Sequence, residues 1–396
     1  MSAIAREGVQ LRLAQFIAFC GIGALMPYFG LLLEDAGLSA WQIAQISIIA
    51  PILKLVIPPA AGLVADLYTG RGNLIRAMNI TAVLTWPMLL WPESFVGWAL
   101  VWIYMSVARG ALSPFLNAAA MDYSHRAIAA GYGHENFGRI RLWGSLGFIA
   151  ATAAGGLLAD AVGIRAVIHL YGVMLALTVV ACWPIDRIHQ PARRREGAQP
   201  ANTLGQLIQL LRTPAFLMAL VGIMLVRTSE GGYNVLYTMH VRHLGYSNTV
   251  AAILWSIGVF SEVALFRWLG AHVSRLPMGR LELWVAIAAG SNVLRWALLG
   301  TGDGWPTLLT GQLLHGISFG MFYLLGIELL DRHAPADFKS TIQGIYDTVA
   351  FGLSALMGQL ASGWVWDHYS PHSMFLVNAI VALLGTSILF GSRSRA

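Results

Sequence analysis

Three ionisable residues lie inside long apolar stretches of the sequence: Glu262, Arg295 and His315. A charged side chain near the centre of a bilayer costs about 2.5–3.5 kcal/mol on insertion scales, so each of them requires a polar partner or a wet cavity. A carboxylate that alternates between a desolvated site and an arginine contact can bind and release a proton. We therefore predict that Glu262 and His315 hold a coupling proton. The alternatives are a fixed Glu262–Arg295 bridge and a His315 that only forms hydrogen bonds.

Arg227 and Glu230 form a second charged group inside an apolar stretch. Residues three positions apart share one face of a helix, so these two side chains can pair with each other. They can instead pair with Asp347 on a later apolar segment and so close a gate between helices. A purely structural pair is at least as good an interpretation. We predict gating or helix pairing for Arg227, Glu230 and Asp347.

Aromatic side chains stand near these polar positions, and Tyr233 follows Glu230 by three residues. Tyr233 and Trp143 can stack on an aromatic or sugar ring, which predicts that they contact a substrate. Ordinary packing is the alternative for either ring taken alone. Most other tryptophans lie near the ends of apolar segments, as is typical of the aromatic belts at membrane surfaces.

The composition explains why these charges are unusual. Of the 396 residues 57% are hydrophobic and only 11% are charged, whereas soluble domains carry about 25% charged residues. Such a chain requires a bilayer. Its long apolar stretches favour helices over a barrel, because barrel strands alternate over roughly 10 residues. The net charge of +6 lies in short loops, which indicates membrane orientation and not nucleic-acid binding.

The apolar segments predict twelve transmembrane helices, each long enough to cross about 30 Å of hydrocarbon. They are expected at residues 12–34, 41–66, 74–91, 95–117, 138–160, 165–184, 214–240, 249–270, 281–300, 305–330, 339–366 and 371–391.

The distribution of basic residues predicts the orientation of these helices. If the N-terminus is cytoplasmic, nearly all arginine and lysine residues outside the spans fall on the cytoplasmic side, and only Arg165 and Arg242 fall on the other. This bias predicts an inner-membrane protein of bacterial type with both termini in the cytoplasm.

The longest polar stretch, 185–213, divides the chain into two sets of six helices. A linker between two six-helix halves is typical of a duplicated carrier. We therefore predict an N-terminal bundle at 1–184, a cytoplasmic linker at 185–213 and a C-terminal bundle at 214–396.

The loop after the second predicted span carries Gly62-Leu63-Val64-Ala65-Asp66 and then Arg71. This run resembles the signature loop between helices 2 and 3 of the major facilitator superfamily. Glycine allows close helix packing, and Asp66 can cap a helix or pair with an arginine. The family's basic residue directly after the aspartate is Leu67 here. A gating role for Asp66 and Arg71 is the expectation, with a simple helix-ending turn as the alternative.

A second resemblance covers nearly the whole chain. It rests on Phe137–Ser145, Gly245-Tyr246-Ser247, Leu254–Val259 with Glu262, Leu294-Arg295-Trp296 and Leu314-His315-Gly316. Together, in this order and spacing, they resemble the phenylpropionate-permease group, which is related to the lactose permease.

This resemblance implies residue roles. Glu262, Arg295 and His315 are separated by 33 and then 20 residues, the spacings of a charged cavity network in the permease. Arg141 matches its substrate-binding arginine, and Trp143 is expected beside it. The permease's further acid is Ser318 here, so the identity of the proton carrier departs from the family. Arg141, Trp143, Tyr233 and Arg295 are thus the expected substrate-binding residues.

Motifs of other function classes are missing from the sequence. It has no P-loop, no Gly-x-Ser-x-Gly or HExxH sequence and no Cys/His metal spacing. We therefore expect no enzyme, no metal and no cofactor, and a proton gradient as the driving force.

These expectations combine into one leading hypothesis. It is proton symport by alternating access, with a small organic solute, an aromatic carboxylate, bound near the midplane between the halves. The expected partners are the solute, protons and the lipid bilayer, with no nucleic acid, and the expected functional form is a monomer. A sugar or nucleoside proton symporter and a proton-coupled efflux antiporter are the alternatives.

Overall fold

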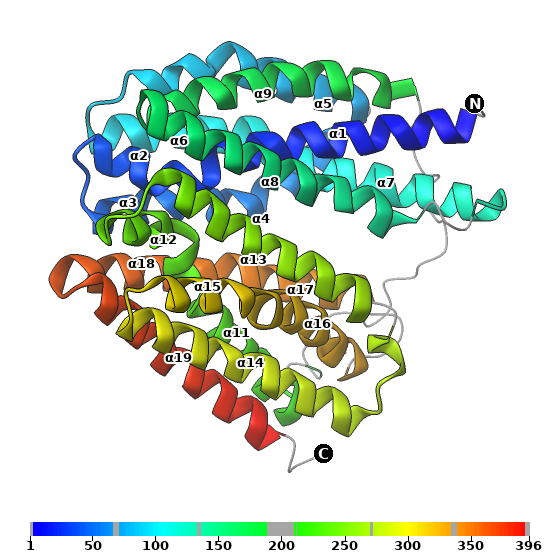
Figure 1. Cartoon of the computed structure of the whole chain (residues 1–396). Coiled ribbons are helices and arrows are strands. Elements are labelled where there is room, and N and C mark those ends of the chain that lie inside the picture. The colour runs from blue at the N-terminus through cyan, green and yellow to red at the C-terminus, as the bar shows by residue number, and fades with distance from the viewer. Residues whose placement is uncertain are drawn as a thin grey trace. The chain divides into compact units, whose positions relative to one another are not determined.

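The computed structural model describes residues 3–65, 71–132, 136–187, 210, 212–269, 272–333 and 339–392. Within these ranges the chain forms helices and no strand (Figure 1). A helix satisfies its backbone hydrogen bonds within one segment, which is what a chain without water around it needs. The predicted all-α fold class is confirmed.

Several helices of the first half are interrupted where proline removes a backbone donor. Pro27 lies in the short helix η1, and Pro87 lies in η3. The elements are α1 (Ala3–Leu25), η1 (Met26–Tyr28), α2 (Phe29–Asp35), α3 (Ala40–Ser47), α4 (Ile49–Val64), α5 (Arg71–Thr85), η3 (Trp86–Leu90), α6 (Phe95–Arg109), α7 (Leu112–Ala129), α8 (Phe137–Val162), α9 (Ala166–Cys182) and η4 (Trp183–Arg187).

The second half contains two π-helical segments, η6 and η8, inside otherwise α-helical spans. Its elements are α11 (Pro214–Thr228), α12 (Gly231–His243), α13 (Asn248–Leu269), η5 (Val273–Arg275), α14 (Met278–Thr301), α15 (Trp305–Leu313), η6 (Gly316–Met321), α16 (Phe322–His333), α17 (Lys339–Asp347), η8 (Thr348–Leu353), α18 (Ser354–His368) and α19 (Pro371–Ser392).

The twelve predicted spans can be compared with these helices. Among the described residues, 11 helices are long and apolar enough to cross a membrane. The remaining predicted span, 74–91, forms α5 and η3; it is less apolar because α5 carries Arg71, Asn73 and Arg76. Large apolar side chains are exposed on the helices, for example Leu100, Val180 and Ile380. Such a surface suits lipid and not water, and the protein is an integral membrane protein.

Packing divides the chain into two compact units, each with its own core. The first comprises Met1–Pro191 and Val235–Ser256, and the second comprises Ala192–Asn234 and Ile257–Ala396. The first core includes Leu116, Tyr123 and Ile140, and the second includes Phe216, Phe322 and Tyr346. The helices of each unit thus bury one apolar face against their neighbours.

The predicted topological division of the chain stays a prediction. Most of the predicted linker, 185–213, lies outside the described residues. The grouping by packing places Val235–Ser256 with the first unit, although this segment was predicted to belong to the C-terminal bundle.

Candidate functional site

The seventh predicted span is broken within the second unit. α11 ends at Thr228 and α12 begins at Gly231, which leaves Ser229 and Glu230 between two helices. Glycine is required at the start of α12, because a Cβ on Gly231 would lie 2.3 Å from the carbonyl carbon of Gly358 in α18. The two backbones touch at this point, so tertiary packing holds the break in place.

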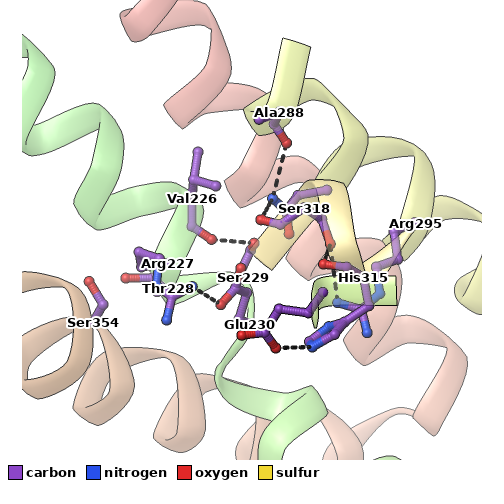
Figure 2. Close-up of polar contacts among 12 residues, drawn as sticks. Val226, Arg227, Thr228, Ser229, Glu230, Ala288, Arg295, His315, Ser318 and Ser354 are labelled. Atoms are coloured by element: carbon purple, nitrogen blue, oxygen red, sulfur yellow. Dashed lines mark hydrogen bonds and ion pairs between the residues drawn. The ribbon is translucent and has the colours of Figure 1, made fainter. Parts of the chain in front are cut away.

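Ser229 ties the break to α14. Its hydroxyl donates to the carbonyl oxygen of Val226 at 2.6 Å and accepts a hydrogen bond from the indole Nε1 of Trp296 at 2.9 Å. Ser229 and Trp296 are both fully buried. Ser229 is therefore hydrogen-bonded both to α14, through Trp296, and to the last turns of α11, through Val226; Figure 2 shows the bond to Val226.

Glu230 and Arg227 form a buried charge pair across the break. Nη1 of Arg227 lies 2.6 Å from Oε2 of Glu230, and each side chain is only 3% exposed. The three-residue spacing allowed this pairing as one of two alternatives, and the structure contains it, while the predicted gating role of the two residues stays a prediction. Although the atoms are close, the contact lacks hydrogen-bond alignment, and neither carboxylate oxygen of Glu230 accepts a hydrogen bond from the described residues. The two side chains are thus held by charge and not by a directed bond.

The guanidinium of Arg227 contacts two aromatic rings. It is 4.5 Å from the ring centroid of Phe319 and 4.4 Å from that of Phe351. Phe319 belongs to η6 and Phe351 to η8, so each ring is presented by a π-helical turn. Such turns are rare and occur frequently at functional sites. Two cation–π contacts therefore stabilise the Arg227 cation independently of Glu230.

Arg295 of α14 is fully buried among polar and aromatic groups. Its Nε donates to the carbonyl oxygen of Gly311 at 2.9 Å, and its Nη1 donates to Oγ of Ser318 at 3.3 Å. Its guanidinium lies 4.1 Å from the ring centroid of Tyr233. Nη2 has no hydrogen-bond partner among the described residues. The Nη2 group of this buried cation can therefore donate a hydrogen bond to an acceptor on a bound molecule.

Glu262 of α13 and His315 lie together beside this arginine's helix. Oε2 of Glu262 is 3.8 Å from Nε2 of His315, with the two side chains 20% and 7% exposed. The His315 ring stacks on Phe319 at 5.0 Å. Gly320 makes room for the carboxylate, since a Cβ there would lie 2.8 Å from Cγ of Glu262. Among its described contacts Arg295 forms no ion pair with Glu262, so the fixed bridge that the sequence left open is absent from this structure.

The second unit thus brings six of the predicted residues into one cluster: Arg227, Glu230, Tyr233, Glu262, Arg295 and His315. Asp347 is different. It ends α17 and accepts hydrogen bonds from Nε2 of Gln343 at 3.1 and 3.2 Å. Its predicted alternative pairing with Arg227 is not among the contacts described for either residue.

The predicted loop residues are only partly described. Asp66 lies outside the described residues, and Arg71 begins α5 while its side chain lies outside them. The gating roles predicted for Asp66 and Arg71 therefore stay predictions.

The other two predicted substrate residues belong to the first unit, on α8. The guanidinium of Arg141 lies 4.2 Å from the ring centroid of Phe19 in α1. Trp143 packs edge-on against Phe16 at 6.3 Å and is 41% exposed. Residues two apart do not share a helix face, so Arg141 and Trp143 present different sides of α8. Their predicted substrate contacts stay predictions.

Several members of the cluster were not predicted from the sequence. The hydroxyl of Tyr233 donates to Oε1 of Gln312 at 2.9 Å, and Nδ2 of Asn292 donates to the carbonyl oxygen of Ser318 at 3.0 Å. Both Gln312 and Asn292 are fully buried amides, which is the signal that polarity inside an apolar segment could have given. The two rings that contact Arg227 could not have been found in this way, because phenylalanine is ordinary in an apolar helix.

The cluster combines buried arginines, two carboxylates, a histidine and aromatic rings within one bundle. In the described part of the chain no three His, Cys, Asp or Glu side chains come together as metal ligands do.

Known proteins match this chain along its length. It is 25% identical over 388 residues to the maltose permease of Geobacillus stearothermophilus, covering 98% of this chain and 94% of that protein. It is also 25% identical over 378 residues to the probable 3-phenylpropionic acid transporter of Escherichia coli (strain K12), covering 94% of each.

A solved structure shows the same fold. The crystal structure of the nucleoside transporter NupG matches with a TM-score of 0.82 and 18% identity over 98% of both chains. The predicted fold of twelve helices in two bundles is confirmed by this likeness. A family model described as the MFS_1 like family matches residues 9–377. The chain therefore belongs to the MFS_1-like family of the major facilitator superfamily of secondary transporters.

Proposed function

We propose that the protein is a proton symporter that carries a small organic anion, an aromatic carboxylate, into the cell across the inner membrane. The observation that carries this proposal is the fully buried Arg295, whose Nη2 has no hydrogen-bond partner among the described residues. A buried donor without an acceptor costs about 1–3 kcal/mol, and more when it is charged. A carboxylate supplies the missing acceptor and a charge-assisted hydrogen bond.

The rings around Arg295 favour an aromatic body on that carboxylate. Its guanidinium lies against Tyr233 and Trp296, and the Tyr233 ring is 5.6 Å from the ring of His315. Flat π faces beside a cation suit a substrate that has one charged end and one ring. The likeness to a protein named as a probable 3-phenylpropionic acid transporter supports the same class of substrate.

Proton coupling is supported by the titratable groups of the same cluster. Glu230, Glu262 and His315 lie in the second unit with Arg295, in spans that are otherwise apolar. Ionisable residues inside membrane spans commonly mark proton relays of transporters. The excess of arginine on one side of the predicted spans supports cytoplasmic termini.

Proton movement in lightly buffered vesicles tests this function. The purified full-length protein is reconstituted, 3-phenylpropionate is added outside, and the external pH is followed. Alkalinisation that disappears with a protonophore and in empty vesicles is the expected result. Acidification would identify an antiporter and overturn symport, and tracer uptake of 3-phenylpropionate without any pH change would overturn proton coupling.

A neutral sugar or nucleoside is the second candidate substrate. Nε2 of Gln312 and Oδ1 of Asn292 are buried without hydrogen-bond partners among the described residues, and hydroxyl groups can satisfy both. Relatives named as a maltose permease and a nucleoside transporter support this reading. Maltose and a nucleoside are therefore tested in the same vesicles. A pH change with either of them, and none with 3-phenylpropionate, would replace the anion by a neutral solute.

A further inference from the structure

Two carboxylates of the cluster differ in their surroundings. The Glu262 side chain is 20% exposed, and its Oε2 lies 3.8 Å from Nε2 of His315. The Glu230 side chain is 3% exposed, and neither of its oxygens accepts a hydrogen bond from the described residues. A carboxylate that lacks donors has only opposite charge to hold it ionised. The ionised state of Glu230 therefore depends on nearby positive charge, and Arg227 is the cation in direct contact with it.

We infer that Glu230, and not Glu262, is the carboxylate that binds and releases the coupled proton. This inference rests on the proposed proton symport. The sequence alone predicted that Glu262 or His315 carries the proton. The step is a simple one. A proton from water binds an oxygen of Glu230 when its contact with Arg227 opens, and the proton leaves when that contact reforms; no other bond changes.

The surroundings of Arg227 allow this step. Removing one partner of a buried ion pair costs about 3–5 kcal/mol, because the other charge is left uncompensated. Arg227 keeps two ring faces, Phe319 at 4.5 Å and Phe351 at 4.4 Å, when Glu230 becomes neutral. A desolvated cation–π contact contributes about 2 kcal/mol. Because both contacts remain when the pair opens, Arg227 is not left without any stabilising neighbour.

Charged and titratable groups reach Glu230 from several helices. Arg227 acts on it from α11 and Arg295 from α14, and the hydroxyls of Tyr233 on α12 and Tyr346 on α17 also interact with it electrostatically. Glu262 and His315 belong to the same cluster. Two cations thus act on one carboxylate. An anionic substrate that binds Nη2 of Arg295 cancels part of this positive field and favours proton uptake at Glu230.

Hydrogen bonds and ring contacts also connect Arg295 to the helix break that carries Glu230. Trp296 follows Arg295 directly and donates to Ser229, which precedes Glu230. Tyr233, in the first turn of α12, packs on Arg295 and donates to Gln312. A substrate held by Arg295 and Tyr233 therefore acts on both sides of the helix break that carries Glu230. Proton binding and substrate binding are thus coupled through the joint, which is the break at Ser229 and Glu230 between α11 and α12.

The proton site is tested without any substrate by infrared difference spectroscopy during a pH titration. The full-length protein in lipid nanodiscs is compared with Glu230→Gln and with the control Glu262→Gln. We expect the carbonyl band of a protonated carboxylic acid to disappear in Glu230→Gln and to persist in Glu262→Gln. A band that persists in Glu230→Gln, or a wild-type protein without such a band, would overturn the inference. Glu230→Asp keeps a carboxyl group and is expected to restore the band.

A transport measurement separates this inference from the proposed function. In the vesicles, Glu230→Gln is expected to lose uphill accumulation of 3-phenylpropionate while substrate exchange at equal concentrations persists. If the wild-type protein moves no protons with 3-phenylpropionate, maltose or a nucleoside while its band still titrates, symport fails and the proton site stands. If the wild-type protein moves protons and Glu230→Gln moves as many per substrate, symport stands and Glu230 is not the carrier.

Discussion

The two units place their ion pairs differently. In the described part of the first unit, Arg126 pairs with Glu7, and Arg165 pairs with Asp35, at the ends of helices. In the second unit, Arg227 pairs with Glu230 and His315 lies beside Glu262 where spans are broken or widened. The described pairs of the first unit thus lie near helix termini. The second unit has such pairs too, Arg332 with Glu328 and His372 with Asp303, and adds pairs inside the membrane spans.

Two arginines inside the spans of the first unit rest on aromatic rings. Arg141 lies over Phe19, and Arg109 lies 5.8 Å from the ring centroid of Tyr171. The second unit adds carboxylates and a histidine to such cation–ring contacts. Arg141 lies within the uninterrupted helix α8, whereas Glu230, the carboxylate that we propose exchanges protons, lies between two helices. Proton chemistry is therefore expected to be asymmetric between the units.

The largest effect is expected from a substitution that disturbs the packing of the joint. In Gly358→Ala, the new Cβ would lie 2.0 Å from the carbonyl oxygen of Thr228, and backbone cannot move aside cheaply. We expect a loss of about 3 kcal/mol in the free energy of unfolding, at the upper end of overpacking costs. Reversible unfolding in mixed micelles measures it. Gly62→Ala in α4 of the first unit has open space around its Cβ and is the matched control; equal losses in the two variants would show that the joint is not specially packed.

The joint also marks the limit of what the sequence could predict. Apolar length predicted the helices, and the three-residue spacing allowed the Arg227–Glu230 pair, because both depend on local periodicity. The break at Ser229 and the π-helical turns η6 and η8 were not predicted. They depend on contacts between distant segments, such as Gly231 against Gly358, which no local pattern reports.

The charged residues of the candidate site were predictable from the sequence, but their contacts were not. Charges in apolar segments are conspicuous, so Glu262, Arg295 and His315 were found from the sequence alone. Their partners were not: the pairing of Glu262 with His315, and the two rings that contact Arg227, follow from how four spans meet. The sequence predicts which groups are present, while packing decides which of them can exchange a proton.

A second test compares the substrate-binding arginines of the two units. Arg295→Gln removes a charge-assisted hydrogen bond worth about 1.5–3 kcal/mol, so the apparent affinity for 3-phenylpropionate should fall by about 10- to 150-fold. Arg141 is only half-buried and rests on Phe19, so Arg141→Gln should cost less. The concentration dependence of tracer uptake measures both variants. A larger loss for Arg141→Gln would place the anion's main contact in the first unit.

A third test compares the rings on which the arginines rest. Arg227 is buried, so Phe351→Leu should lower the free energy of unfolding by about 2 kcal/mol, whereas Phe19→Leu under the half-buried Arg141 should cost about 0.5–1 kcal/mol. Repeating Phe351→Leu in the Arg227→Met background separates the cation–π contact from the volume change. An unchanged loss in that background would mean that Phe351 acts by packing alone and that Arg227 depends on Glu230.

The smallest effect is expected where the first unit uses a carboxylate to cap a helix. Asp160 accepts hydrogen bonds from the backbone N–H groups of Asn248 and Thr249 at 2.9 and 2.8 Å, and also from both of their side chains. These N–H groups begin α13, where a negative charge also meets the positive end of the helix dipole. Asp160→Asn keeps the shape and removes the charge, so a loss of about 0.5–1 kcal/mol is expected, as faster hydrogen exchange in the first turn of α13.

Arg165→Gln is the matched control for Asp160→Asn, since it breaks the exposed pair with Asp35 and should leave exchange in α13 unchanged. Unchanged exchange in Asp160→Asn would mean that neutral hydrogen bonds suffice for this cap. If Asp160→Asn instead reduced proton uptake per substrate in the vesicles, a carboxylate of the first unit would take part in coupling. The contrast between the two units would then fail. Asp160, which accepts four hydrogen bonds, would take part in proton transfer as we propose for Glu230, which accepts none from the described residues.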